Sequence, residues 1–223
     1  MKTIILNGSP KGNVENCGSY LLAKAFVSKM NTPCEIRSIF KENRESLMDS
    51  LCHFDNVIII APNYIHSVPA GTLDFLYALP RSHVKRSIGF IIQSGYPESS
   101  ESEIVCRYLE KFGERLGYNV LGAIAKGECA GLAIMPQRYK KLLNDFSEFG
   151  VLFERTGRFD KTYIDGFSKP IRLSRFQVCV LNALAPVSKV FGWNRILKEN
   201  NAYEKRLDMP YIEKAGGDIV AQN

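Results

Sequence analysis

Five short runs of apolar, largely β-branched residues alternate with longer segments of helical periodicity, and this alternation limits the possible folds more than any other feature of the chain. It is typical of a parallel sheet covered by helices on both faces. The runs at 56–61 and 87–93 are almost continuously apolar, as expected of central strands buried on both sides. The predicted strands are 3–7, 35–40, 56–61, 87–93 and 119–125.

The segments between these runs place their apolar residues at helical spacing. Segment 101–116, for example, has Val105, Leu109 and Phe112 on one face and ends before Gly117. The predicted helices of the sheet domain are 19–30, 42–52, 70–79, 101–116 and 136–153. The fold class is therefore α/β, a doubly wound five-stranded parallel sheet in a domain at 1–156. A helical C-terminal extension at 157–223 follows, with its main helix at about 174–197.

Composition excludes several other classes of protein. The chain has 223 residues, 45% hydrophobic and 23% charged, which is ordinary for a soluble globular protein that needs no disulfide or metal to fold. Its six cysteines are scattered with no Cys-x-x-Cys pair, so we expect free thiols and no metal site. No signal peptide or membrane-spanning run is recognisable, so we expect a cytoplasmic protein. The net charge of +6 is concentrated in the last third, and we do not expect nucleic-acid binding.

Three loops are expected at the carboxyl edge of the sheet, where doubly wound folds bind ligands. The first, 8–20, is rich in Gly, Ser and Asn and leads into a helix, so its N–H groups and hydroxyls can surround an anion. It lacks the Gly-Lys-Ser/Thr ending that a nucleoside triphosphate requires, whereas a monophosphate needs only hydroxyls and amides. From this loop alone, a phosphate site and a plain surface loop are both open.

The second and third loops follow the third and fourth strands. Loop 61–70 contains two prolines around Tyr64, whose ring either packs against a planar ligand or closes the core. Loop 93–101 contains Gly95, which allows close approach of a ligand, and a Ser-rich end that favours a helix start. Each loop by itself is weak evidence for a binding site.

Taken together, the three loops resemble the NADPH-dependent FMN reductase and flavodoxin-like NAD(P)H oxidoreductase family. Its members show Gly-Ser-Pro, then Pro-x-Tyr-x-x-x-x-Pro, then a Ser-Gly loop, as at Gly8, Pro62 and Ser94 here. The resemblance covers 1–153 and implies a flavodoxin-like fold with FMN as cofactor and NADPH or NADH as co-substrate. It implies no catalytic side chain, because the flavin supplies the chemistry.

The resemblance also implies which residues bind FMN. The phosphate group would be surrounded by Ser9, Lys11, Cys17, Gly18, Ser19 and Tyr20. One edge of the flavin ring would be lined by Pro62, Asn63, Tyr64 and Ile65, and the other by Ser94, Gly95 and Tyr96. Relatives often have Ser-Asn-Ser or Gly-Asn-Ser where this chain has Cys17-Gly18-Ser19, so the phosphate would depend more on Ser9, Ser19 and backbone amides.

The C-terminal extension also resembles one branch of these oxidoreductases, through Trp193-Asn194 and the later Lys205-Arg206-x-Asp-x-Pro-Tyr pattern that ends at Tyr211. Its apolar helix contains basic residues, and no acid lies between Asp165 and Glu199. We expect it to pack on the main domain or on the partner of a homodimer. Contact with a membrane surface is the less favoured alternative.

The predicted function is an FMN-dependent NAD(P)H oxidoreductase that passes a hydride from nicotinamide through the flavin to a small acceptor. The acceptor would be a quinone, a nitro or azo compound, or free flavin. Two other functions stay open: a non-enzymatic electron carrier like flavodoxin, and a flavodoxin-fold interaction protein without cofactor. Electron carriers of this kind are usually strongly acidic, whereas the pI of this chain is about 9.0.

Overall fold

The computed structural model describes residues 2–82 and 86–209, and contains the predicted five-stranded parallel sheet. The strand order is β2-β1-β3-β4-β5, which is the flavodoxin-like order of a doubly wound sheet. The predicted fold class is therefore confirmed. The strands are β1 (Thr3–Asn7), β2 (Cys34–Ser38), β3 (Asn56–Pro62), β4 (Ser87–Gln93) and β5 (Asn119–Lys126).

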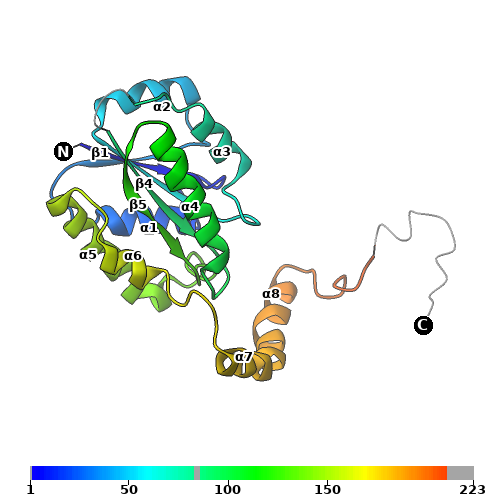
Figure 1. The fold of residues 1–223 in the computed structure, drawn as a ribbon. Helices are drawn as coiled ribbons and strands as arrows, with labels where there is room; N and C mark the ends of the chain where they lie inside the picture. The colour runs from blue at the N-terminus through cyan, green and yellow to red at the C-terminus, as the bar shows by residue number, and fades with distance from the viewer. Residues whose placement is uncertain (1, 83–85, 210–223) are drawn as a thin grey trace. The chain divides into compact units, whose positions relative to one another are not determined.

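Among the described residues up to Arg172, six α-helices cover both faces of the sheet (Figure 1), and two short 3-10 helices, η1 (Leu51–His53) and η2 (Pro136–Tyr139), accompany them. On one face, α2, α3 and α4 pack on Ile4, Ile59 and Phe90; on the other, α1, α5 and α6 pack on Ile5 and Ile58. The helices are α1 (Gly18–Val27), α2 (Arg44–Ser50), α3 (Ala70–Tyr77), α4 (Ser100–Arg115), α5 (Lys140–Thr156) and α6 (Lys161–Phe167).

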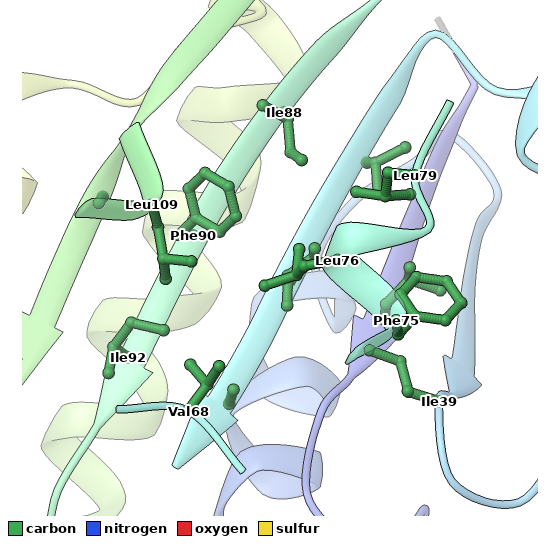
Figure 2. Close-up of a cluster of buried hydrophobic side chains, with 14 of the residues drawn as sticks. Ile39, Val68, Phe75, Leu76, Leu79, Ile88, Phe90, Ile92 and Leu109 are labelled. Atoms are coloured by element: carbon green, nitrogen blue, oxygen red, sulfur yellow. The ribbon is translucent and has the colours of Figure 1, made fainter. Parts of the chain in front are cut away.

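The two buried layers follow from the period of two along each strand. In β4, Ile88, Phe90 and Ile92 point toward α3 and α4, whereas Ile91 points toward the opposite layer. Figure 2 shows Phe90 and Ile92 beside Leu109 of α4, with Leu76 of α3 in the middle of the cluster. Since neither face of the sheet is open to water, the near-continuous apolar runs in the sequence are explained.

Helix α6 was not expected from the sequence, and the first compact unit runs to Arg172, beyond the domain boundary expected at 156. Phe159 and Phe167 are buried against α5, with ring centroids of Phe159 and Phe149 4.9 Å apart. The N–H groups of Ser99 and Ser100 at the start of α4 donate to the carbonyls of Pro170 and Ile171. The segment after 156 is therefore part of the sheet domain because its aromatic side chains complete the core.

The second unit begins at Leu173 and is helical, as the sequence predicts for the extension. Helix α7 (Arg175–Ser188) starts with a capping box between Ser174 and Gln177, and continues through a π-helical segment, η3 (Lys189–Trp193), into α8 (Asn194–Glu199). The wider π turn follows Pro186, which lacks the N–H group of a regular helix. Residues 210–223 of the predicted extension, including Tyr211, lie outside the described residues.

Candidate functional site

The three predicted loops lie at one edge of the sheet, at the carboxyl ends of β1, β3 and β4. The strand order reverses between β1 and β3, so the first two loops diverge from the switch point of the sheet. Hydrogen bonds continue past the strand ends: Asn63 N donates to Gln93 O at 2.7 Å and Ser94 N to Lys126 O at 2.8 Å. The candidate site is thus attached to the rigid sheet.

The first loop is held in shape by the buried side chain of Asn7. Its Nδ2 donates to Gly12 O at 2.8 Å and to Asn13 Oδ1 at 3.0 Å, while its Oδ1 accepts from Ser9 N at 3.0 Å. Gly12 has φ +79°, and a Cβ there would lie 2.7 Å from Lys41 Cγ, so a larger residue would disturb the turn. Asn7 organises this loop, and sequence reasoning did not single it out, although it is the last residue of a predicted strand.

The loop ends at the amino terminus of α1, where Cys17 is the N-cap residue and its side chain makes no capping hydrogen bond. The Cys17 thiol is 1% exposed and points toward Asn7, and no acidic residue lies in the first turn. The hydroxyl of Ser19 is fully buried and accepts from Gln93 Nε2 at 3.4 Å. What this end of the loop offers an anion is therefore the backbone N–H groups of the first helical turn, combined with the helix dipole.

The first loop carries no unpaired negative charge that would repel an anion. Glu15 is the one acid between residues 8 and 20, and it pairs with Lys24 at 2.7 Å. The Lys11 ammonium folds back over the loop and donates to Asn16 O at 3.1 Å. Lys24 also lies 5.6 Å from the ring centroid of Tyr20, one turn earlier on the same helix.

The second loop contains a strained turn. Ile65 and His66 have φ of 48° and 63°, and Tyr64 N donates to Ser67 O at 2.6 Å across them. A β-branched residue such as Ile rarely has positive φ, and backbone strain of this kind clusters at functional sites. The turn leaves Ile65 91% exposed and Tyr64 52% exposed at the edge of the sheet, whereas Pro62 is buried in β3.

Two buried polar atoms at this edge have no hydrogen-bond partner among the described residues: Asn63 Oδ1 and Ser94 Oγ. The other side-chain atom of Asn63, Nδ2, donates to Ser102 Oγ of α4 at 3.1 Å, which fixes the orientation of the amide. An unpaired buried polar atom costs about 1 to 3 kcal/mol, so each of these two atoms on adjacent loops needs a partner, which a water molecule or a ligand can supply.

The third loop packs against a fourth, 127–133, that sequence reasoning missed. Glu128 N donates to Tyr96 O at 2.6 Å and Cys129 N to Ser94 O at 2.8 Å. A Cβ on Gly127 would lie 2.8 Å from Tyr96 O, and one on Gly95 would lie 3.3 Å from Ala130 Cβ. Gly127, directly after the fifth strand, was the available signal, because close backbone contacts require glycine.

Cys129 in the fourth loop carries no reactive thiolate. All six are free, as expected from their spacing, and Cys129 is 4% exposed. Burial raises the pKa of Cys129 to about 12, against a smaller opposing effect of the nearby Lys126 ammonium. Its thiol therefore stays protonated at neutral pH and is no nucleophile. No group of three or more His, Cys, Asp or Glu side chains able to hold a metal ion occurs in the described part of the chain.

The order of the strands defines the class of structure: a flavodoxin-like α/β fold, whose switch point lies between β1 and β3. Within residues 2–82 and 86–209, no helix has the length and apolar character needed to cross a membrane. No family model and no curated protein sequence matches the chain significantly.

Solved structures with the same fold match well. An NADPH-quinone reductase from P. pentosaceus aligns over 68% of this chain and 98% of its own, at 18% identity and TM-score 0.52. An NADH:FMN oxidoreductase in its apo form aligns over 76% and 96%, at 14% identity and TM-score 0.53. RosB, solved with bound 8-demethyl-8-formylriboflavin-5'-phosphate, aligns over 83% and 87%, at 12% identity and TM-score 0.52. At these identities the likeness shows that the fold is shared.

Proposed function

We propose that this protein belongs to the NADPH-dependent FMN reductase family and is an FMN-dependent NAD(P)H oxidoreductase. It passes a hydride from nicotinamide to a small acceptor such as a quinone, a nitro or azo compound, or free flavin. The observation that carries the proposal is the pair of unpartnered buried atoms, Asn63 Oδ1 and Ser94 Oγ, at the same edge of the sheet as the amino terminus of α1, which no side chain caps. The fold is one in which solved neighbours are named as reductases that use FMN, NADH or NADPH.

The residues at the edge fit an FMN molecule. Ser9, Lys11 and the N–H groups of Gly18 and Ser19 would bind the phosphate, with Cys17 and Tyr20 completing the wall around it. Asn63 and Ser94 would bind the polar edge of the ring, with Pro62, Tyr64, Ile65, Gly95 and Tyr96 around it. When bound, FMN supplies reversible hydride and electron transfer.

The side chains of this chain then have positioning and electrostatic roles. The N–H groups of Gly95 and Tyr96 donate to no acceptor among the described residues, and are available to stabilise negative charge on a bound ring. The exposed rings of Tyr64 and Tyr96, 52% and 65% accessible, border the space through which nicotinamide and acceptor would enter. The nicotinamide of NADPH or NADH would bind over the flavin ring first. The small acceptor would then bind at the same place.

Titration of the purified protein with FMN tests the proposal. We expect flavin fluorescence to be quenched with saturable binding, and NADPH or NADH to be oxidised in the presence of a quinone. Ser94→Ala should weaken FMN binding about 2- to 10-fold, as expected for one lost hydrogen bond, without lowering the stability of the cofactor-free protein. Ser38→Ala is the matched control, because Ser38 Oγ on β2 is also buried and unpartnered but belongs to none of the loops.

The outcomes separate the three candidate functions. FMN binding without NAD(P)H oxidation would favour the electron carrier, although a pI of about 9.0 is unlike the acidic carriers. No binding of FMN or riboflavin phosphate analogues by the folded protein would favour an interaction protein and remove the oxidoreductase.

A further inference from the structure

A cavity lined by none of the proposed flavin-binding residues lies at the end of β5. It has a volume of about 340 Å³ and is bordered by β5, the start of α5 and the end of α6. Three of its lining residues are basic, Lys126, Arg138 and Lys141, and two are acidic, Glu128 and Asp145. Tyr139, Leu142, Gly166 and Phe167 complete the wall.

Lys126 is the unusual residue of this cavity. The residue as a whole is only 7% exposed, but its ammonium stays accessible and makes no hydrogen bond or ion pair with any described residue. Its charge acts instead on the Cys129 thiol, which is protonated and offers no counter-charge. The Lys126 ammonium is therefore open to an anion that enters the cavity.

The remaining charges leave the cavity open to an anion. Asp145 is already paired with Lys141 at 2.7 Å, so it does not neutralise Lys126. Glu128 is exposed at the rim, and Arg138 forms no ion pair within the described residues. The short 3-10 helix Pro136–Tyr139 leads directly into α5, no side chain caps the start of either, and the first turns contain no acid, so the positive end of this continuous helical segment adds to the two unpaired cations.

We propose that this cavity binds a phosphate group, held between Lys126 and Arg138 at the amino end of α5. A lysine ammonium, a guanidinium and a helix terminus together match the charge and the acceptor oxygens of a phosphate dianion. The volume leaves room for part of the molecule that carries the phosphate, and the Tyr139 and Leu142 side chains offer it an apolar wall. The source of the phosphate is free inorganic phosphate or a phosphorylated nucleotide. The proposal does not depend on flavin binding.

Isothermal titration calorimetry of the full chain with inorganic phosphate, adenosine 2'-monophosphate and adenosine tests the proposed phosphate site. We expect both phosphates to bind and adenosine not to bind. Lys126→Gln should weaken binding at least about 10-fold, as loss of a charge-assisted hydrogen bond predicts. Lys140→Gln removes a charge from the same helix end without lining the cavity, and should change affinity less than about twofold. Tighter binding of the nucleotide would identify it as the source, and equal affinity would identify the free anion.

A second variant tests the cavity without replacing the buried residue Lys126, so that loss of binding can be distinguished from loss of folding. A Cβ on Gly166 would meet no atom within 4 Å, so Gly166→Glu places a carboxylate at the cavity without a clash. It should abolish phosphate binding while Gly166→Ala retains it, with unchanged far-ultraviolet circular dichroism for both. Unchanged affinity in Lys126→Gln and Gly166→Glu would overturn the proposal, as would no phosphate binding at millimolar concentration. Loss of phosphate binding in Gly18→Asp alone would assign the anion to the first loop and equally overturn it.

Discussion

Gly18 is the residue at which the proposed phosphate site is most easily tested. It opens α1, and a Cβ there would have its nearest neighbours at 3.8 Å, so there is space for a side chain. An aspartate at this position would stabilise the helix through the dipole but repel a bound phosphate. The effects on folding and on binding therefore have opposite signs.

We expect Gly18→Asp to leave the melting temperature of the cofactor-free protein unchanged or higher, and to weaken FMN binding at least about 10-fold. Gly18→Asn is the control, because it has nearly the same size without the charge. Fluorescence titration with FMN and with riboflavin measures the difference. Equal loss for both flavins would show that the phosphate binds elsewhere.

Glu110 on α4 is a residue whose ionisation works against folding. Desolvation raises the pKa of this carboxyl, and Glu114 raises it further, against the opposing hydrogen bond from the Ala123 backbone. A folded state with raised pKa binds the proton more tightly than the unfolded chain. The stability that this proton contributes is present below the unfolded pKa and is lost as the pH rises through the folded pKa.

We therefore expect Glu110→Gln to stabilise the protein at pH 7, by roughly 0.5 kcal/mol because water still screens part of the carboxyl. The gain should disappear near pH 3.5, where the carboxyl is protonated in both states. Urea unfolding at the two pH values measures it, with Glu35→Gln as an exposed control on β2. A gain that is the same at both pH values would contradict this explanation.

At the scale of elements, α5 is the helix whose position the sequence specifies most tightly. A Cβ on Gly150 would lie 1.8 Å from the carbonyl oxygen of Phe26 on α1, so the two backbones are in direct contact. Phe146, Phe149 and Phe153 are fully buried around this contact. Because the two helices cross so closely, α5 determines where α1 lies on the sheet. It therefore also determines the position of the amino terminus of α1, where the first loop ends.

Gly150→Ala should cost about 2 to 4 kcal/mol of unfolding free energy, because the helices must move apart. Gly166→Ala is a matched control in α6: no atom lies within 4 Å of its Cβ, so alanine should be neutral or should stabilise the helix by about 0.5 to 1 kcal/mol. Chemical denaturation of both variants makes the comparison. Similar free energies would mean that α1 and α5 do not cross as closely as the structure has them.

At the scale of the whole molecule, the two units have very different cores. Both buried clusters lie within the first unit, and their last member is Phe167. In the second unit, α7, η3 and α8 have no buried residue, and Phe176 and Phe191 are each 76% exposed. Such exposed apolar surface is typical of a segment that binds something else. We propose that these helices pack on the main domain or on the partner of a homodimer.

A chain truncated after Arg172 should fold and keep its melting temperature within about 5 °C, because it retains the complete core. The full chain should sediment as a dimer and the truncated chain as a monomer in analytical ultracentrifugation. Co-sedimentation of both with anionic liposomes tests the alternative of membrane contact. Binding of the full chain alone to liposomes, with both chains monomeric, would replace the dimer by the membrane surface.

The sequence by itself determined the sheet and its class, because buried parallel strands must be continuously apolar and their helices must show one apolar face. β1 and β4 begin and end where the apolar runs do, and the other strands differ by a residue or two. The three loops could be found for the same reason: they follow the predicted strand ends. The free cysteines could be expected from their spacing.

Only the tertiary structure decided which atoms of those loops are free. Asn63 Oδ1 and Ser94 Oγ are without a partner, while the Ser19 hydroxyl is engaged with Gln93 on a strand 74 residues away. Helix α6, the fourth loop and the cavity beside Lys126 depend on contacts between distant segments, such as Phe167 with Phe146. Local patterns record which residues are apolar and where the chain turns, whereas hydrogen-bond partners and burial are set by packing between elements, which no local pattern contains.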